Sequence, residues 1–556
     1  MSIVSERAGL VPRLAPTPTQ HGVIAMGTRG MVATAHPLSA LVGMNVLMRG
    51  GNAVDAAIAT AAVECVVLPA MCGLGGDAFA IVYEARSGQL TAINGSGIAP
   101  ATATRDYFVS HGYKKMPLYG MLSVAVPGAV DVYEKLWRRF GTMDWAELWE
   151  PAIRLAEDGH PLGERMSGRI AESEAKLAKF PTSARIFLPY GRVPAPGDIL
   201  VQKELAASMR LVAKGGADAF YRGEIARRIV AFSRENGGLF TEEDFAGHSS
   251  DIYTPLRTTY RGYEVYETAP PSQGLIVLEE LNLVEGFDLQ GMGFLSAQAI
   301  HTMVEAKKLA FADRLRHCAD PRFVKNPLPQ LLSKAHAARR RRLIDPERAM
   351  DSVPGTDPED LVGDTTYFAV VDRDGNAVSF IHSLSASFGS GVVAGDTGIL
   401  LNNRAGRGFS LVEGHINVIE PGKRTMHTLN CYMIFRDGKP WVVGGTPGGD
   451  QQPQWNLQII TDLIDFGLNV QEAAEAPRWF SFPGTDPEFV DEPFELWVED
   501  RIAPEVRHAL EAKGHRVKVL GPWDSGGVVQ LIMIDQERGV LLGGSDPRGG
   551  GLALGW

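Results

Sequence analysis

Short apolar runs alternate with longer helical segments over residues 30 to about 340. The first set comprises Met31–Ala35, Pro37–Arg49 and Ala53–Val67, and the spacing of their apolar positions predicts one strand followed by two helices. Gly50-Gly51-Asn52 supplies a C-terminal cap for the first helix and an Asn that can cap the second. This part of the chain therefore reads as helix-rich α/β structure.

A glycine-rich segment, Gly73-Leu74-Gly75-Gly76-Asp77, precedes the apolar run Ala78–Tyr83, which is predicted to be a buried strand. A phosphate-binding glycine loop opens a helix and carries a Lys followed by Ser or Thr. Neither feature is present, so the segment does not indicate a nucleotide site.

The pattern changes at Leu343. Residues Leu343–Asp364 carry seven acids, three prolines and one Arg, and without a periodic apolar face they predict an exposed linker. Thr365–Val371, an Asp-Gly turn and Asn376–Ile381 follow, and they predict a β-hairpin. A β-rich second part of the chain thus begins at Thr365.

The composition narrows the class of protein. The chain has 556 residues, 45% of them hydrophobic and 21% charged, as in globular enzymes. Its net charge of −11 disfavours nucleic acid or an anionic membrane as a partner. Of four cysteines only Cys65 and Cys72 are close in sequence, which is neither a disulfide framework nor CxxC spacing. We expect no metal and no organic cofactor.

The amino terminus has no continuous apolar segment of the kind found in signal peptides. The longest apolar stretch, Ala53–Ala70, is interrupted by Asp55, Thr60 and Glu64, so it does not predict a membrane span. We expect a cytoplasmic protein, or a periplasmic one if a signal peptide has been removed.

A threonine placed directly after an acidic tether can serve as a nucleophile. Its hydroxyl has no base of its own, but cleavage of the preceding peptide bond frees an α-amine that can act as one. The reference pKa of such an amine, about 7.7 to 8.0, suits that role near neutral pH. From these residues alone, Thr365 can equally be an ordinary first residue of a strand.

Eight spaced segments decide between these interpretations. From about residue 22 to the carboxyl terminus the chain contains, in order, Gly50–Ala57, Gly73-x-Gly75-Gly76, Ala99-Pro100, Val126-Pro127-Gly128, Gly363-Asp364-Thr365-Thr366, Gly398–Asn403, Pro447-Gly448-Gly449 and Ser545-Asp546-Pro547-Arg548. Together they resemble the γ-glutamyltranspeptidase family of N-terminal nucleophile hydrolases.

The resemblance implies a precursor that cleaves itself between Asp364 and Thr365. The products would be a large subunit, residues 1–364, and a small subunit, residues 365–556, which together form one catalytic unit. The implied fold is an αββα sandwich with strands from both subunits, an α/β (α+β) architecture. Catalysis in this family passes through an acyl-enzyme on the threonine hydroxyl.

Catalytic roles follow from the resemblance where residues match. Thr365 takes the place of the nucleophile and its freed amine that of the general base. Ser383 matches the hydroxyl that hydrogen-bonds the nucleophile, or it is a plain serine at a strand end. Gly448 and Gly449 match the backbone N–H groups that bind the oxyanion, or they form a simple tight turn.

The chain departs from the family pattern where the γ-glutamyl group is recognised. γ-Glutamyl enzymes carry an Arg just before the Ala-Pro pair, and this chain has none there. After the Asn-Asn pair those enzymes have a Gln and then the acid that binds the α-ammonium, whereas here Arg404 takes the place of the Gln. Arg407 lies nearby in an uncertain alignment. His427 and Thr428 replace two serines, and Ser385 replaces an Asn. Chemistry is therefore expected to be kept and glutamyl recognition lost.

This pattern resembles the acylase and amidohydrolase branch of the family, including oxamate amidohydrolase-like and cephalosporin acylase-like members. We expect a self-processing amidohydrolase, with possible acyltransferase activity, for a small amide whose acyl group is anionic, with Arg404 binding the carboxylate. Arg404 has a structural ion pair as its alternative role. Two other functions remain open: a true γ-glutamyl hydrolase or transpeptidase, and an unprocessed, inactive binding protein. The processed enzyme can form a homo-oligomer of heterodimers.

Overall fold

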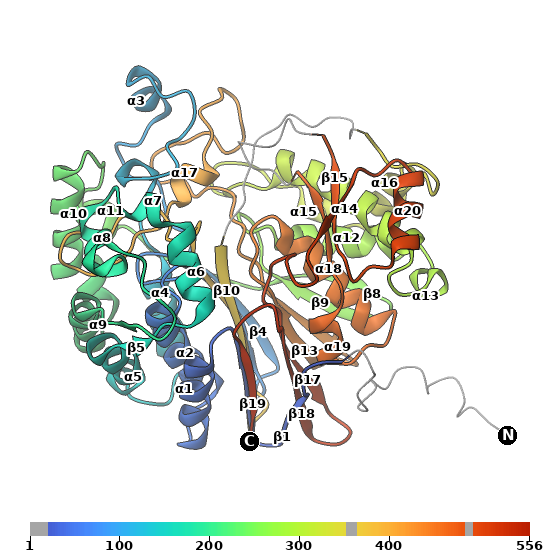
Figure 1. The fold of residues 1–556 in the computed structure, drawn as a ribbon, viewed down its shortest axis with the longest axis horizontal. Helices are drawn as coiled ribbons and strands as arrows, with labels where there is room; N and C mark the ends of the chain where they lie inside the picture. Colours follow the sequence, from blue (N-terminus) through green and yellow to red (C-terminus); the bar gives the residue numbers. More distant parts are fainter. Residues whose placement is uncertain (1–19, 352–363, 484–492) are drawn as a thin grey trace.

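The computed structural model describes residues 20–351, 364–483 and 493–556, and two seven-stranded antiparallel sheets form its centre (Figure 1). Sheet 1 has, in order, β19 (Leu552–Gly555), β2 (Gly30–Thr34), β10 (Asp364–Asp372), β11 (Ala377–Ser385), β3 (Asp77–Glu84), β4 (Gln89–Asn94) and β7 (Asp251–Tyr253). Sheet 2 has, in order, β1 (Ala25–Gly27), β18 (Val540–Ser545), β17 (Gln530–Asp535), β13 (Lys439–Gly445), β12 (Tyr432–Arg436), β9 (Tyr263–Glu267) and β8 (Leu256–Tyr260).

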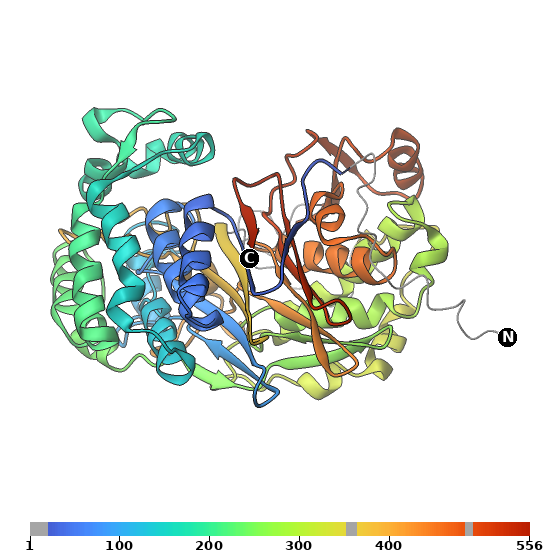
Figure 2. The ribbon, with the colours of Figure 1, turned by 90° about the horizontal axis from the view of Figure 1, so that it is seen from below.

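Helices cover the outer face of each sheet, so the layers run helix, sheet, sheet, helix (Figure 2). On the side of sheet 1 are α1 (Pro37–Met48), α2 (Ala53–Val67), α4 (Ala129–Phe140), α5 (Trp145–Asp158), α9 (Lys203–Tyr221) and α10 (Glu224–Glu235). On the side of sheet 2 are α12 (Gly274–Val284), α14 (Ala297–His317), α16 (Lys334–Arg341), α18 (Gln451–Ile464), α19 (Val470–Glu475) and α20 (Pro504–Ala512). The predicted αββα sandwich is confirmed.

Shorter elements complete the described part of the chain. The remaining helices are α3 (Arg105–Ser110), α6 (Glu164–Glu172), α7 (Glu174–Leu177), α8 (Pro181–Phe187), α11 (Glu242–Ala246), α13 (Leu289–Met292), α15 (Leu328–Leu331) and α17 (Arg404–Gly408). A small sheet comprises β14 (Trp479–Phe482), β15 (Glu495–Glu499) and β16 (Val517–Leu520), and β5 (His160–Pro161) pairs with β6 (Ile199–Leu200). Within these described ranges, no helix is both long and apolar enough to cross a membrane.

Strand β10 shows how the two layers of core are built. Tyr367, Ala369 and Val371 point into the core between the sheets, whereas Phe368 and Val370 belong to the core beneath the helices. This alternation follows from the two-residue period of a strand. Because both faces are covered, β10 is apolar without interruption from Tyr367 to Val371, which made it recognisable in the sequence.

Strands from before and after residue 364 are neighbours in both sheets. In sheet 1, β10 lies between β2 and β11, and β11 in turn pairs with β3. In sheet 2, β12 pairs with β9. The compositional boundary at Asp364 therefore does not separate two independently folding units.

Helix α2 has the predicted bounds and cap. Asn52 accepts hydrogen bonds from the N–H groups of Val54 and Asp55, and the Asp55 side chain accepts one from the Asn52 N–H, which forms a capping box. A Cβ on Gly43 of α1 would lie 2.4 Å from Thr60 Oγ1 of α2, so the small residues allow close packing. The carboxyl-terminal half of α2 is thereby held against β10 and β11.

Six of the nine described residues of the expected linker, 343–351, are exposed as predicted, but this stretch is also held against the core. Ile344 and Ala349 are buried, the Ala349 N–H donates to the carbonyl of Lys513, and the Met350 N–H donates to Glu305. Two apolar side chains among the acids are enough to hold this stretch against α14 and α20. Residues 352–363 of the linker lie outside the described part of the chain.

Candidate active site

Thr365 and Ser383 are brought together by a bulge between β10 and β11. Asp364 pairs with Ser385 and Thr366 with His382, so two residues of β11 stand opposite Thr365. The Thr365 hydroxyl donates to Ser383 Oγ at 3.1 Å, and both side chains are fully buried. The predicted pair of hydroxyls is therefore a close contact.

Ser385 lies opposite the Asp364–Thr365 bond in the strand pairing. Its backbone has a φ of 84°, which is rare for residues other than Gly. Its N–H donates to Ser383 Oγ at 2.8 Å, while its own hydroxyl is buried and has no partner among the described residues. Ser385 thus offers a free hydroxyl beside the bond expected to be cleaved.

Asp77 adds a buried carboxylate that the sequence reasoning missed. It stands opposite Ser383 in the pairing of β3 with β11. Its Oδ2 lies 3.1 Å from Arg404 Nε and 3.0 Å from His427 Nε2, and its Oδ1 accepts the N–H of Gly97 at 3.0 Å. An acid at the start of an apolar strand was the only sequence signal for this role.

The protonation states of this cluster follow from its hydrogen bonds. The Leu429 N–H donates to His427 Nδ1, so Nε2 carries the proton and donates it to Asp77. Burial, together with the charge of Arg404, lowers the pKa of His427 to about 4, so the ring is neutral. Burial opposes ionisation of Asp77, but His427 and Arg404 hold its pKa below the usual value. Asp77 and Arg404 therefore form a charged pair.

Only some of the hydrogen-bond donors of the Arg404 guanidinium have partners among its neighbours. Its Nε pairs with Asp77 and its Nη1 donates to Thr428 Oγ1 at 3.2 Å. Its Nη2 is buried and makes no hydrogen bond to any residue that the structure describes. Burial lowers the pKa of Arg404 to about 10, with Asp77 opposing the shift, so the guanidinium stays charged at neutral pH.

Two asparagines position Arg404 relative to β11. Asn402 Oδ1 accepts the N–H of Arg404 at 2.9 Å. The Asn403 N–H donates to the carbonyl of Leu384, and Asn403 Oδ1 accepts the N–H of Ala386. The Asn-Asn pair therefore fixes the start of α17 against the end of the strand that carries Ser383.

The glycine turn after β13 is linked to the same cluster. Gln273 Nε2 donates to the carbonyls of Thr428 at 2.6 Å and Gly449 at 2.8 Å. Gly448 and Gly449 have φ values of 136° and 56°, and a Cβ on Gly448 would lie 2.2 Å from the Trp455 ring. Only glycine fits at Gly448, so the turn brings backbone groups close to the site with no side chain in the way.

A second polar network, which the sequence did not predict, lies next to Thr365 and Ser383. His382 Nε2 lies 2.8 Å from Glu64 Oε2, which also accepts the Thr366 hydroxyl at 3.2 Å. His382 Nδ1 lies 2.9 Å from the Tyr133 hydroxyl. Because Thr366 and His382 are the neighbours of Thr365 and Ser383, this network fixes both strands at the bulge.

The predicted site residues fall into three connected groups. Thr365, Ser383 and Ser385 form the first, and Asp77 connects it through the sheet to Arg404, His427 and Thr428. Gln273 then connects Thr428 to the glycine turn. The uncertain Arg407 also reaches this region, because its Nη1 donates to the Ser385 carbonyl at 3.4 Å.

Comparison with known proteins identifies the family. The family model for gamma-glutamyltranspeptidase matches residues 39–556. The chain belongs to the γ-glutamyltranspeptidase family. The relatives described next are named as hydrolases or acylases that act on amide bonds. The chain is accordingly an amide-bond hydrolase.

The relatives cover nearly the whole chain, and their names indicate two kinds of substrate. The glutathione hydrolase-like YwrD proenzyme of Bacillus subtilis is 40% identical over 95% of this chain and 99% of its own. The glutathione hydrolase proenzyme of Escherichia coli is 38% identical over 94% and 90%. The crystal structure of the cephalosporin acylase from Bacillus halodurans is 37% identical, with a TM-score of 0.90 over 98% of this chain and 99% of its own. The word proenzyme in the names of the first two relatives supports maturation of one precursor into two subunits.

Proposed function

We propose that this chain cleaves itself between Asp364 and Thr365 and then hydrolyses a small amide through an acyl-enzyme. In the precursor, the Thr365 hydroxyl attacks the carbonyl carbon of Asp364, and the acyl group moves from nitrogen to oxygen. Water then hydrolyses that ester, which leaves a carboxylate on Asp364 and a free amine on Thr365. The contact between Thr365 and Ser383 at 3.1 Å is the observation that carries this proposal.

The same hydroxyl then acts on the substrate. The α-amine of Thr365 takes the hydroxyl proton as the oxygen attacks the amide carbonyl, and it gives that proton to the leaving nitrogen. Backbone N–H groups of Gly448 and Gly449 stabilise the tetrahedral oxyanion. A water, deprotonated by the same amine, hydrolyses the ester and releases the acid.

The acyl group is proposed to carry a carboxylate that binds Arg404. Support comes from the buried Nη2 of Arg404, which has no hydrogen-bond partner among the described residues and would gain one from a ligand oxygen. The free hydroxyl of Ser385 and the side chains of His427 and Thr428 complete the polar lining of this acyl pocket. A charge-assisted hydrogen bond of this kind contributes about 1.5 to 3 kcal/mol.

A γ-glutamyl group is the second candidate, and Asp77 is the observation that favours it. The acid that binds an α-ammonium in γ-glutamyl enzymes is missing from its usual segment, but Asp77 places a carboxylate beside Arg404 from another strand. An acyl group with both a carboxylate and an ammonium would then find a partner for each. The two glutathione hydrolase relatives agree with this alternative.

A hydrolysis screen with matched acyl groups separates the two candidates. The processed enzyme is assayed with oxamate and with glutaryl, succinyl, γ-glutamyl and β-lactam-linked amides, and with a neutral butyryl amide as the reference. The proposal predicts that an anionic acyl group without an amine gives the highest kcat/KM. It also predicts that Arg404→Gln lowers that value roughly tenfold to a hundredfold while leaving the butyryl value unchanged.

Two further variants make the result decisive. Arg404→Lys should restore only part of the activity, because an ammonium lacks the planar fork of a guanidinium. If the γ-glutamyl amide is the best substrate and Asp77→Asn abolishes that preference, the second candidate is correct. If Arg404→Gln changes kcat/KM equally for anionic and neutral substrates, Arg404 has only a structural role. The proposal of an anionic acyl group would then be wrong.

A further inference from the structure

Three potential metal ligands meet on the side of sheet 2, away from the active site. His301 and Glu305 are four residues apart on α14, so their side chains share one face of that helix. His515, which precedes β16, completes the cluster, and the ligand atoms of all three residues lie within 4.8 Å of one another. His301 and Glu305 are fully buried, and His515 is 7% exposed.

The tautomer of His301 already suits metal binding. Its Nε2 lies 2.8 Å from the carbonyl oxygen of Asp345, so Nε2 carries the proton and Nδ1 presents its lone pair. Metal-binding histidines commonly donate their second N–H to a backbone carbonyl in this way. His301 Nδ1 faces His515 Nε2 at 2.8 Å, so the single proton between the two rings stands where an ion would bridge them.

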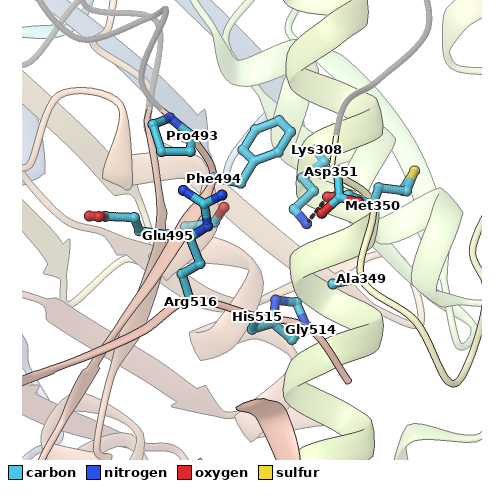
Figure 3. A pocket seen from close by; sticks show the side chains of 11 residues that line it. Lys308, Ala349, Met350, Asp351, Pro493, Phe494, Glu495, Gly514, His515 and Arg516 are labelled. Carbon is cyan, nitrogen blue, oxygen red and sulfur yellow. Dashed lines mark hydrogen bonds between the residues drawn. The ribbon is translucent and has the colours of Figure 1, made fainter. Parts of the chain in front are cut away.

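A cavity borders this cluster at His515. Its volume is about 110 Å³ and its lining includes His515, Lys308 and Phe494, as Figure 3 shows. A water occupies about 30 Å³ in the liquid, so the cavity has room for a water as an additional ligand. The Glu305 carboxylate is fixed from two sides, by Lys308 Nζ at 2.7 Å and by the Met350 N–H at 2.9 Å.

A second group of three potential metal ligands in the described residues is a weaker candidate for a metal site. Cys65, Cys72 and His382 also lie within 4.8 Å of one another. However, both ring nitrogens of His382 are already engaged, with Glu64 and Tyr133, and this network is explained by its contact with the bulge at the active site.

We propose that His301, Glu305 and His515 bind one divalent transition-metal ion of the zinc type. Two imidazoles and one carboxylate, with a water in the remaining position, form a common ligand set for such ions. When the ion binds, the His515 proton moves from Nε2 to Nδ1, and no net charge other than that of the ion enters the site.

The ion has a structural task at this position. The Asp345 carbonyl and the Met350 N–H contact two of its ligands, so it fastens residues 345–350 to α14 and to the segment that carries His515. These residues lead toward the boundary at Asp364. The ion would therefore hold residues 345–350 in place, and this inference does not depend on which amide the enzyme hydrolyses.

A metal titration of the untagged, chelator-treated protein tests this site. Co²⁺ followed by visible absorption should bind with one ion per chain, and Zn²⁺ should displace it. His515→Gln and Glu305→Gln should each weaken binding by at least about tenfold. His336→Gln is the matched control, because His336 lies outside the cluster and pairs with Asp313, and it should bind as the wild type does.

Thermal melting distinguishes the loss of the metal site from the misfolding of a variant. Saturating Zn²⁺ should raise the Tm of the wild type and of His336→Gln, because the ion binds the folded state, and it should not raise that of His515→Gln. The proposal is overturned if the wild type binds no more tightly than His515→Gln. A thiolate-to-cobalt absorption band that is lost in Cys65→Ser would also overturn it, because the ion would then lie at the cysteines.

Discussion

Asp77 and Arg404 are 327 residues apart in the chain, yet Arg404 Nε lies 3.1 Å from Asp77 Oδ2 in a fully buried ion pair. The ion pair lowers the net positive charge of the proposed acyl pocket. A lone Arg404 would make it cationic, whereas the carboxylate of Asp77 offsets that charge. What remains for a ligand is the unpartnered Nη2 edge of Arg404, a directional donor within a nearly neutral cluster.

A double-mutant cycle should measure this pair directly. Arg404→Gln or Asp77→Asn alone is expected to destabilise the protein by about 3 to 5 kcal/mol, because each leaves a buried charge without its partner. The double variant should recover a large part of that loss. Denaturant unfolding in a Thr365→Ala background, which is expected to keep the chain in one piece, provides the measurement. Strictly additive losses would contradict a direct interaction.

Removal of the Ser383 hydroxyl should slow both self-cleavage and turnover. Ser383→Ala takes away the partner of the Thr365 hydroxyl at 3.1 Å, and the loss of a buried partner costs about 1 to 3 kcal/mol. We expect kcat/KM to fall roughly tenfold to a hundredfold. Ser379→Ala on the same strand is the control, since Ser379 bonds Tyr367 instead. Equal effects of the two changes would show that Ser383 is merely structural.

The backbone of the site could be predicted from sequence because its signals are local. Apolar runs and turn residues marked β10 and β11, Asn52 marked the start of α2, and the linker drew attention to Thr365. The resemblance to the family then supplied the sandwich and the pairing of Thr365 with Ser383. The described structure confirms the sandwich, β10, β11 and α2, and it shows the contact between Thr365 and Ser383.

The side-chain partners could not be predicted because they depend on pairing across long separations. Asp77 reaches Ser383 only through the register of β3 with β11. Gln273, just before α12, joins Thr428 to Gly449 across separations of 155 and 176 residues. The packing of residues 343–351 was missed for another reason. Only Ile344 and Ala349 are buried there, among mostly exposed residues, and two isolated apolar positions give no periodic signal in the sequence.

Acid should weaken the protein through His427. Burial lowers the pKa of this ring from 6.5 to about 4, so between these pH values the unfolded chain binds a proton that the folded chain does not. Stability is therefore fully present above pH 6.5 and declines as the pH falls toward 4, by on the order of 3 kcal/mol from this residue.

The contribution of His427 can be isolated by comparison. His36 and His160 also have pKa values lowered by burial to about 4, so the wild type alone reports a sum. His427→Gln keeps an N–H that can donate to Asp77 but does not titrate. In the Thr365→Ala background, the difference in unfolding free energy between pH 7 and pH 4.5 should be smaller for His427→Gln. An unchanged difference would show that His427 is protonated in the folded state.

Turnover should not require a metal ion. The proposed nucleophile, base and oxyanion donors are all groups of the chain itself, and the proposed ion at His301, Glu305 and His515 lies apart from them. Treatment with EDTA well below the melting temperature should leave kcat unchanged, although it should lower the Tm if that site is filled. Loss of kcat that is restored by Zn²⁺ would contradict this expectation.

The central claim is that Thr365 is the residue at which the chain cleaves itself. Intact-mass analysis of purified wild-type protein and of Thr365→Ala tests it in one experiment. The wild type should give two polypeptides, the smaller beginning at Thr365 and containing 192 residues, while Thr365→Ala should remain a single chain. A wild-type protein that stays intact, or a Thr365→Ala variant that is still cleaved before residue 365, would contradict the account.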